Sequence, residues 1–261
     1  MREHKAELVA VVEEGKKMEK NEQIIKTTPQ SLNEFIGQDR VRENLSIAIE
    51  AAKKRNEPLD HILLCGSQGL GKTTMARIIA HEMNADIKAI SCNDVKNESA
   101  MRGILSNMNA GDILLLSDIQ MINQSVCDSL IEAMTNFSFQ IILGKENKFI
   151  TVDLAHFTII CETEKFSLSP RELQNCFGIV EYFEAYTGEQ LKMMIKRWVA
   201  QLQILIGDDE ANELATNCNG MPSTARRMLK KTRDYAEVLN NGIVSREIVE
   251  KVVEQERDLG R

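Results

Sequence analysis

The sequence predicts an α/β core, in which helices cover both faces of a parallel sheet, followed by a smaller helical domain. Three observations predict this. Short apolar runs alternate with helical apolar periods from about residue 38 to residue 183. A glycine-rich motif joins one of these runs directly to the helix after it. Beyond Thr187 only helical periods remain.

The elements of the core are expected in a simple order. Residues 1–26 are dense in charge and carry a narrow apolar stripe, which predicts a helical extension before the core. Apolar residues at helical spacing then predict a helix from about Gln38 to Arg55. Strands are expected at HILLC (61–65), IKAIS (87–91), ILLL (113–116), FTIIC (157–161) and GIVEYF (178–183), with helices between them that begin near Lys72, Met101 and Val126.

Two further segments complete the organisation. Apolar runs at 139–143 and 149–153 flank the turn-forming GKENK, so we expect residues 137–154 to form a β-hairpin inserted in the core. Four helical periods, centred on residues 191–203, 209–217, 222–239 and 245–257, predict the helical domain over residues 186–261. The core is therefore expected to span residues 27–185.

Composition restricts the class of protein. The chain has 261 residues, 43% of them hydrophobic, and a net charge of −7, which is typical of a globular protein and argues against a surface that binds nucleic acid throughout. Its apolar stretches are far shorter than the roughly 20 residues that span a bilayer, and no signal-peptide pattern is visible. We therefore expect a cytoplasmic protein without a membrane partner. The 6 cysteines lie far apart, which argues against zinc ligands and disulfides. Cys65 and Cys161 lie inside apolar runs, which predicts that they are packing residues.

One motif carries chemistry. The residues Gly66, Ser67, Gln68, Gly69, Leu70, Gly71, Lys72 and Thr73 match the phosphate-loop pattern G-x-x-x-x-G-K-[ST], directly after an expected strand and directly before an expected helix. The glycines let backbone N–H groups surround phosphate oxygens, and the helix N-terminus adds a favourable dipole. Lys72 is expected to reach the β and γ phosphates, and Thr73 to ligate magnesium. The sequence therefore predicts a site for ATP or ADP with Mg²⁺.

Together with this motif, several segments resemble the RuvB family, the AAA+ motors that drive branch migration of Holliday junctions. These segments are SLNEFIGQDRVRENL, GDILLLSDIQMIN, IILGK, FGIV and GMPSTARRMLKKTRDYAEV, so the resemblance covers nearly everything after about Thr28. It implies an AAA+ P-loop NTPase core with a C-terminal helical lid, and a ring or filament of identical or different AAA+ subunits. It also implies nucleotide contacts from Phe35, Ile36, Thr74 and Pro222. The hairpin 137–154 resembles the family element that contacts a RuvA-like partner, although a simple surface hairpin is an equal alternative.

The chain departs from the family at positions used for catalysis. Where the family has an Asp for magnesium and a Glu that activates water, this chain has Ser117 and Asp118. Asp118 is then the remaining carboxylate that could contact the metal or act as a base. The family's polar sensor pair of two threonines is replaced by Thr163 and Glu164.

The arginines of the family are also replaced. The family places arginines shortly before FGIV, one of which reaches a neighbouring subunit's nucleotide, and this chain has Gln174 and Cys176 at the corresponding positions, with Arg171 as a candidate substitute. In the lid, Ser223 takes the place of the arginine of the G-x-P-R motif. Four catalytic features therefore differ, namely the carboxylate pair, the sensor pair, the arginines before FGIV and the lid arginine, while the phosphate loop is intact. This predicts nucleotide binding with slow intrinsic hydrolysis.

Contacts with DNA depend on one expected lid helix. It carries Arg226, Arg227, Lys230, Lys231 and Arg233, which could bind phosphates or form an ordinary solvated face. The sequence ends at RDLGR, where the family continues into a winged-helix DNA-binding domain, so we expect weak DNA binding by this chain.

Three functions stay open. The first is a RuvB-like ATP-binding component of DNA recombination or repair. The second is a non-enzymatic scaffold or adaptor that nucleotide assembles with a partner protein. The third is a subunit similar to those of clamp loaders.

Overall fold

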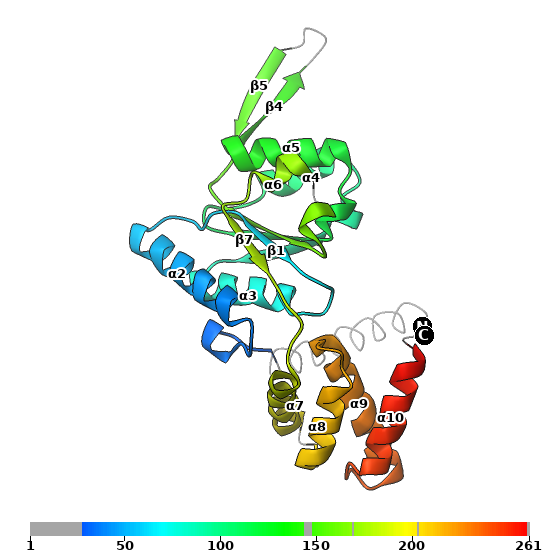
Figure 1. Cartoon of the computed structure of the whole chain (residues 1–261). Helices are drawn as coiled ribbons and strands as arrows, with labels where there is room; N and C mark the ends of the chain where they lie inside the picture. The colour runs from blue at the N-terminus through cyan, green and yellow to red at the C-terminus, as the bar shows by residue number, and fades with distance from the viewer. Residues whose placement is uncertain (1–27, 144–147, 169, 203, 260–261) are drawn as a thin grey trace, which may run out of the picture. The chain divides into compact units, whose positions relative to one another are not determined.

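The structure is a computed structural model that describes residues 28–143, 148–168, 170–202 and 204–259 (Figure 1). The chain divides into two compact units. The core unit is formed by Gln30–Tyr186 with Met221–Ser223, and the lid unit is built mainly from Thr187–Gly220 and Thr224–Arg261. The helix expected for residues 1–26 lies outside the described residues, as does most of the GKENK turn.

A five-stranded sheet forms the centre of the core, and its strand order is β2-β3-β6-β1-β7. All four neighbouring pairs are parallel. The three central strands are buried almost throughout rather than on alternate residues, as expected for a parallel sheet covered on both faces. The predicted α/β class is therefore confirmed. The strands are β1 (Ile62–Cys65), β2 (Ile87–Ser91), β3 (Ile113–Ser117), β6 (Thr158–Thr163) and β7 (Ile179–Tyr182).

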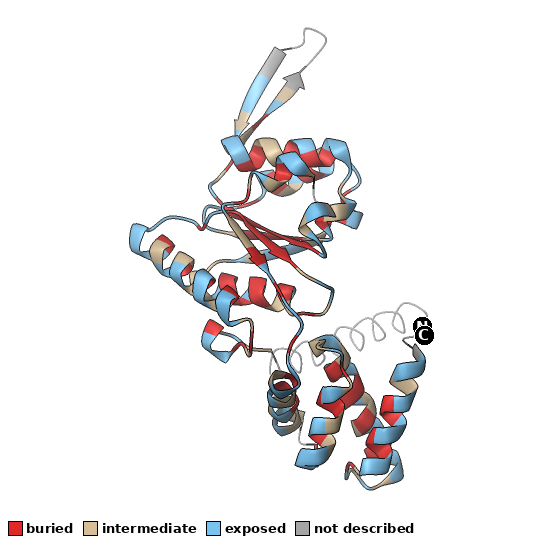
Figure 2. Cartoon of the chain, in the orientation of Figure 1, coloured by how far each residue is buried: buried red, intermediate tan, exposed pale blue. Residues whose placement is uncertain are grey.

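Helices cover both faces of this sheet. Figure 1 shows α2 (Asp39–Arg55) and α3 (Lys72–Met83) on one face, with α4 (Glu98–Ser106), α5 (Gln124–Asn136) and the short α6 (Arg171–Gln174) on the other. Figure 2 shows that the central strands β1, β3 and β6 are buried and that each helix exposes its outer side. Short 3₁₀ turns lie between these elements: η1 (Leu32–Glu34), η2 (Cys92–Asp94), η3 (Ile119–Met121) and η4 (Phe166–Leu168).

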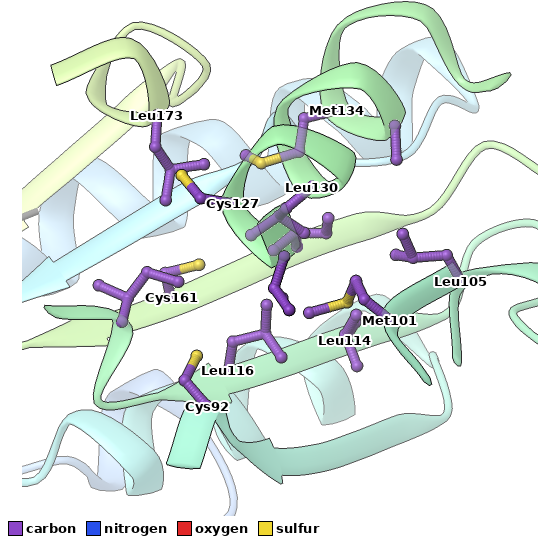
Figure 3. Packing of buried hydrophobic residues seen from close by; sticks show 14 of the residues in the cluster. Cys92, Met101, Leu105, Leu114, Leu116, Cys127, Leu130, Met134, Cys161 and Leu173 are labelled. Atoms are coloured by element: carbon purple, nitrogen blue, oxygen red, sulfur yellow. The ribbon is translucent and has the colours of Figure 1, made fainter. Parts of the chain in front are cut away.

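The hydrophobic core between the sheet and α4 and α5 is rich in sulfur. Figure 3 shows Cys92, Cys127 and Cys161 among leucine and methionine side chains. Burial raises the pKa of Cys92 to about 12 and that of Cys127 to about 11, so both thiols stay protonated at neutral pH. All six cysteines are free, and only Cys176 is not fully buried. The prediction that Cys65 and Cys161 are packing residues is confirmed, and Cys92, Cys127 and Cys218 are buried as well.

The inserted hairpin consists of β4 (Ser138–Leu143) and β5 (Lys148–Asp153), which pair antiparallel and extend beyond α5 (Figure 1). Side chains of α4 and α5 hold its base. The guanidinium of Arg102 lies 5.1 Å from the centre of the Phe139 ring and donates to the carbonyl of Gln140 at 2.9 Å. Glu132 accepts a hydrogen bond from the backbone N–H of Gln140 at 3.1 Å.

The lid unit contains the four helices that the periodicity predicts. They are α7 (Gly188–Leu202), α8 (Asp208–Thr216), α9 (Pro222–Leu239) and α10 (Arg246–Leu259). Their apolar faces are buried against one another, for example at Ile195, Leu214, Met228 and Val249. Among the described residues, no helix combines the length and apolar character that crossing a membrane requires.

Candidate functional site

The phosphate-loop residues connect the end of β1 to the start of α3. Gly66, Gly69 and Gly71 have φ angles of +144°, +86° and +98°, a region that side-chain-bearing residues rarely adopt. Space is also restricted at all three positions, since a Cβ atom on Gly69 would overlap the Ser223 side chain. A Cβ atom on Gly66 would lie 2.8 Å from the carbonyl oxygen of Phe183, and one on Gly71 would lie 3.1 Å from the Phe35 ring. The loop therefore requires glycine for its conformation and for its close packing.

Residues from distant parts of the core anchor this loop. The N–H of Gly66 donates to the carbonyl of Thr163 at the end of β6, at 3.0 Å. The Tyr186 hydroxyl donates to the carbonyl of Leu70, also at 3.0 Å. Phe35 is buried beside Gly71, and the neighbouring Ile36 is half-buried. The segment with the predicted nucleotide contacts Phe35 and Ile36 therefore adjoins the loop.

Lys72 begins α3 and is only 7% exposed. Its ammonium group donates to the carbonyls of Gly66 at 2.6 Å and Ser67 at 2.9 Å. Burial lowers the pKa of Lys72, while the negative charges of Glu162, Glu164 and Asp118 act in the opposite direction. The ammonium group of Lys72 thus lies near three acidic residues at the carboxyl ends of β3 and β6. Ligands of open α/β sheets commonly bind at this carboxyl edge.

A buried carboxylate that sequence analysis did not single out stands next to Thr73. Glu162 lies on β6 and is 7% exposed, and its Oε2 accepts a hydrogen bond from the Thr73 hydroxyl at 3.1 Å. Its Oε1 is buried and has no hydrogen-bond partner among the described residues. Burial raises the pKa of Glu162, against the effects of the Thr73 hydrogen bond and the Lys72 charge. The signal in the sequence was a charged residue at the end of the apolar run FTIIC, directly before Thr163 and Glu164.

The residues predicted for catalysis differ in how they are placed. Asp118 directly follows β3, is exposed, and has a left-handed backbone with φ of +57°. Thr163 is buried, and its hydroxyl donates to the carbonyl of Lys165 at 3.0 Å. Arg171 is exposed at the start of α6. Pro222 is the first residue of α9, and the core unit includes it.

Gln174 and Cys176, which were expected at the arginine positions, contact their own chain. The Gln174 side chain donates to the carbonyl of Phe166 at 3.0 Å. The Cys176 sulfur lies 3.6 Å from the carbonyl of Glu172 and 3.9 Å from the Thr135 hydroxyl. Neither side chain carries a positive charge, so neither can stabilise a phosphate in the way an arginine does.

The basic residues expected on one lid helix all lie on α9, and several contact other lid residues. Arg227 pairs with Glu256 of α10. Arg233 pairs with Asp234 at 3.2 Å and with Glu237 at 3.7 Å, and Arg226 lies 6.0 Å from the centre of the Trp198 ring. Lys230 is exposed and Lys231 is half-buried. The lid itself therefore neutralises part of this basic face.

Comparisons with known proteins give the same family as the motifs. The family model described as the Holliday junction DNA helicase RuvB P-loop domain matches residues 27–183. The model described as the RuvB AAA lid domain matches residues 186–257. This chain belongs to the RuvB family. Its parallel sheet and helical lid are accordingly those of an AAA+ P-loop protein.

RuvB relatives match most of the chain. The RuvB subunit of the Holliday junction branch migration complex from Koribacter versatilis is 39% identical over 232 residues, which are 88% of this chain and 64% of that protein. The corresponding subunit from Fervidobacterium nodosum is 40% identical, over 86% of this chain and 65% of its own length. This chain therefore spans slightly less than two thirds of either relative.

A solved structure agrees with these sequence relatives. The Thermotoga maritima RuvB Holliday junction branch migration motor has a TM-score of 0.79 and 35% sequence identity. The match covers 88% of this chain and 72% of that one.

Proposed function

We propose that this RuvB-family chain binds ATP or ADP with Mg²⁺ at residues 66–73 and acts as an AAA+ component of DNA recombination or repair of the branch-migration type. The observation that carries this proposal is the complete phosphate loop, with Lys72 and Thr73 at the carboxyl edge of a parallel sheet. Thr74, Phe35, Ile36 and Pro222 are proposed as further nucleotide contacts. Magnesium on the phosphates would neutralise part of their charge.

We propose that the isolated chain hydrolyses ATP very slowly. Ser117 provides no carboxylate at the end of β3, and Asp118 is exposed beyond it. Gln174 and Cys176 contact their own chain instead of presenting a cation. An arginine finger contributes a factor of about 10³ to 10⁵ in rate, so its loss alone predicts a large decrease. Arg171, which is exposed on α6, is the proposed substitute in an assembled ring or filament.

Nucleotide binding is tested by calorimetric titration of the wild type with ADP and Mg²⁺. Lys72→Ala should abolish binding, because the ammonium group lies at the loop that would hold the phosphates. The matched control is Lys88→Ala, since Lys88 is exposed on β2 of the same sheet and should not affect binding. Undetectable binding to the wild type at millimolar nucleotide would contradict the proposed function.

Two surfaces are proposed to contact partners. The hairpin β4–β5 is proposed as a contact for a RuvA-like protein, because it extends from the core and resembles the family element (Figure 1). DNA contact is proposed through α9. The alternative function is a nucleotide-assembled scaffold without DNA binding, and the pairing of Arg227 and Arg233 with lid acids favours it.

Fluorescence anisotropy with junction DNA at increasing salt separates these two functions. A DNA component should bind weakly, with a log-affinity slope of about −0.9 per phosphate neutralised. The double charge reversal Arg226→Glu with Lys230→Glu should then abolish binding without changing nucleotide affinity. No binding by the wild type at low salt would favour the scaffold.

A further inference from the structure

The carboxylate lost from β3 has a counterpart one strand away. The strands β3 and β6 pair in parallel with Leu116 opposite Cys161, so the next residues in register are Ser117 and Glu162. Paired residues of neighbouring strands direct their side chains to the same face of a sheet. Glu162 contacts Thr73 of α3, so this is the face that α3 covers. Glu162 therefore lies on the same face of the sheet as Ser117, the position where the resemblance implies an acid in the family.

The hydrogen bonds of Glu162 leave oxygen lone pairs available for a cation. Thr73 uses its hydroxyl proton to donate to Oε2, so the lone pairs of its own Oγ1 stay free for a metal ion. Oε1 of Glu162 is buried without a partner among the described residues. A buried carboxylate oxygen without a partner is costly, and a cation or a water molecule on that cation would satisfy it.

The oxygen set around Thr73 fits Mg²⁺ that arrives with a nucleotide. This ion prefers oxygen ligands, keeps several waters, and is usually held by one or two carboxylates together with substrate phosphates. Within the described ranges, no group of three or more His, Cys, Asp or Glu residues could hold a metal ion by itself. Phosphate oxygens are therefore needed to complete the site.

We propose that Glu162 provides the carboxylate for the magnesium ion of the bound nucleotide, in place of the missing acid on β3. This inference rests on the proposed nucleotide binding. It differs from the expectation that Asp118 is the remaining metal carboxylate, because Asp118 is exposed beyond the end of β3 and Glu162 directly contacts Thr73.

A second buried acid provides a matched control. Leu64 of β1 lies opposite Glu162 on one side and opposite Glu181 of β7 on the other, so both acids share one face of the sheet. Glu181 is 4% exposed and also has one buried oxygen without a partner among the described residues. It accepts its hydrogen bond from Asn44 of α2 at 2.9 Å rather than from Thr73. Glu181→Gln therefore reproduces the loss of a buried charge without changing the contact to Thr73.

The experiment measures ADP affinity by calorimetry in excess Mg²⁺ and again in EDTA. The ratio of the two affinities gives the coupling between metal and nucleotide. Glu162→Gln should keep the affinity in EDTA but lower this coupling about 10- to 100-fold. Glu181→Gln should leave the coupling unchanged. Electron paramagnetic resonance of Mn²⁺ in the presence of ADP should show the same weakening of metal binding directly, without reliance on ATP turnover.

A swap variant makes the test independent of the stability of the single mutant. Ser117→Asp combined with Glu162→Ala returns the acid to β3 and should restore a coupling within about threefold of the wild type. Wild-type coupling in Glu162→Gln would overturn the inference. So would a loss of ADP affinity that is equal in Mg²⁺ and EDTA, or a swap variant that folds but lacks coupling. Failure of the wild type to bind ADP at all would instead contradict the proposed function.

Discussion

Gly66 shows how strongly single residues control the phosphate loop. Its φ of +144° and the 2.8 Å separation between an added Cβ and the Phe183 carbonyl leave no room for a side chain. We expect Gly66→Ala to destabilise the protein by about 1–3 kcal/mol, because strain of this kind persists only when the surroundings enforce it. Urea unfolding measures this loss, and ADP affinity should fall with it.

Gly103 is the control for this substitution. It is exposed within α4, and an added Cβ would meet nothing within 4 Å. Gly103→Ala should therefore stabilise the protein by about 0.5–1 kcal/mol, since alanine is the better helix former. Equal effects of the two substitutions would show that neither backbone conformation nor packing restricts the loop.

The buried His61 should make the free energy of unfolding depend on pH. It is buried just before β1, where its Nδ1 accepts from the N–H of Ile159 at 3.0 Å and its Nε2 lies 3.3 Å from the Met134 carbonyl. Burial lowers the pKa of His61 below 6.5, despite the raising effects of the Met134 hydrogen bond and the Asp60 charge. The unfolded chain therefore binds this proton at a higher pH than the folded chain does.

The sign of the effect follows from this difference. The contribution of His61 to stability is complete above about pH 6.5 and is lost as the pH falls from there toward the lower folded pKa. We expect the free energy of unfolding in urea to fall between about pH 7.5 and 5.5, and His61→Gln to reduce that fall. His81 is exposed on α3, so His81→Gln should behave like the wild type. A pH dependence unchanged by His61→Gln would contradict this explanation.

At the scale of elements, Arg102 of α4 makes two of the contacts at the base of the hairpin. Arg102 lies over Phe139 and donates to the Gln140 carbonyl, while Glu132 of α5 accepts from the Gln140 N–H. We expect Arg102→Ala to increase hydrogen exchange of the β4–β5 amides while the central sheet stays protected. Ser106→Ala is the control, because the Ser106 hydroxyl donates only to the carbonyl of Arg102 in its own helix. Unchanged exchange in the hairpin would show that its base does not depend on this arginine.

At the scale of the whole molecule, we expect hydrolysis to depend on assembly, because Gln174 and Cys176 are proposed to stand in place of the family's arginines. If their loss limits turnover, Gln174→Arg with Cys176→Arg should raise the ATPase rate only when subunits meet. The rate per subunit should then increase with protein concentration. In the wild type, Arg171→Ala should abolish the residual rate if Arg171 is the substitute. A rate per subunit that does not depend on concentration would indicate that these positions do not act across an interface.

Much of the fold could be predicted from local sequence patterns. Fully apolar runs predicted the buried parallel strands, because a strand covered on both faces is apolar at nearly every position. Helical periods predicted the four lid helices, because a helix buried on one face repeats its apolar residues every three or four positions. The phosphate loop was visible because its glycines and Lys72 are neighbours in sequence. Such features depend on residues close together along the chain.

The contact between Glu162 and Thr73 could not be predicted in this way, since 89 positions separate the two residues. Tertiary structure alone sets the order β2-β3-β6-β1-β7, which places β6 between β3 and β1. That order brings Glu162 beside Ser117 and next to the first turn of α3. In the lid, only the packing of α9 and α10 pairs Arg227 with Glu256. Strand order and helix packing decide which distant charges meet, and burial then determines how strongly they interact.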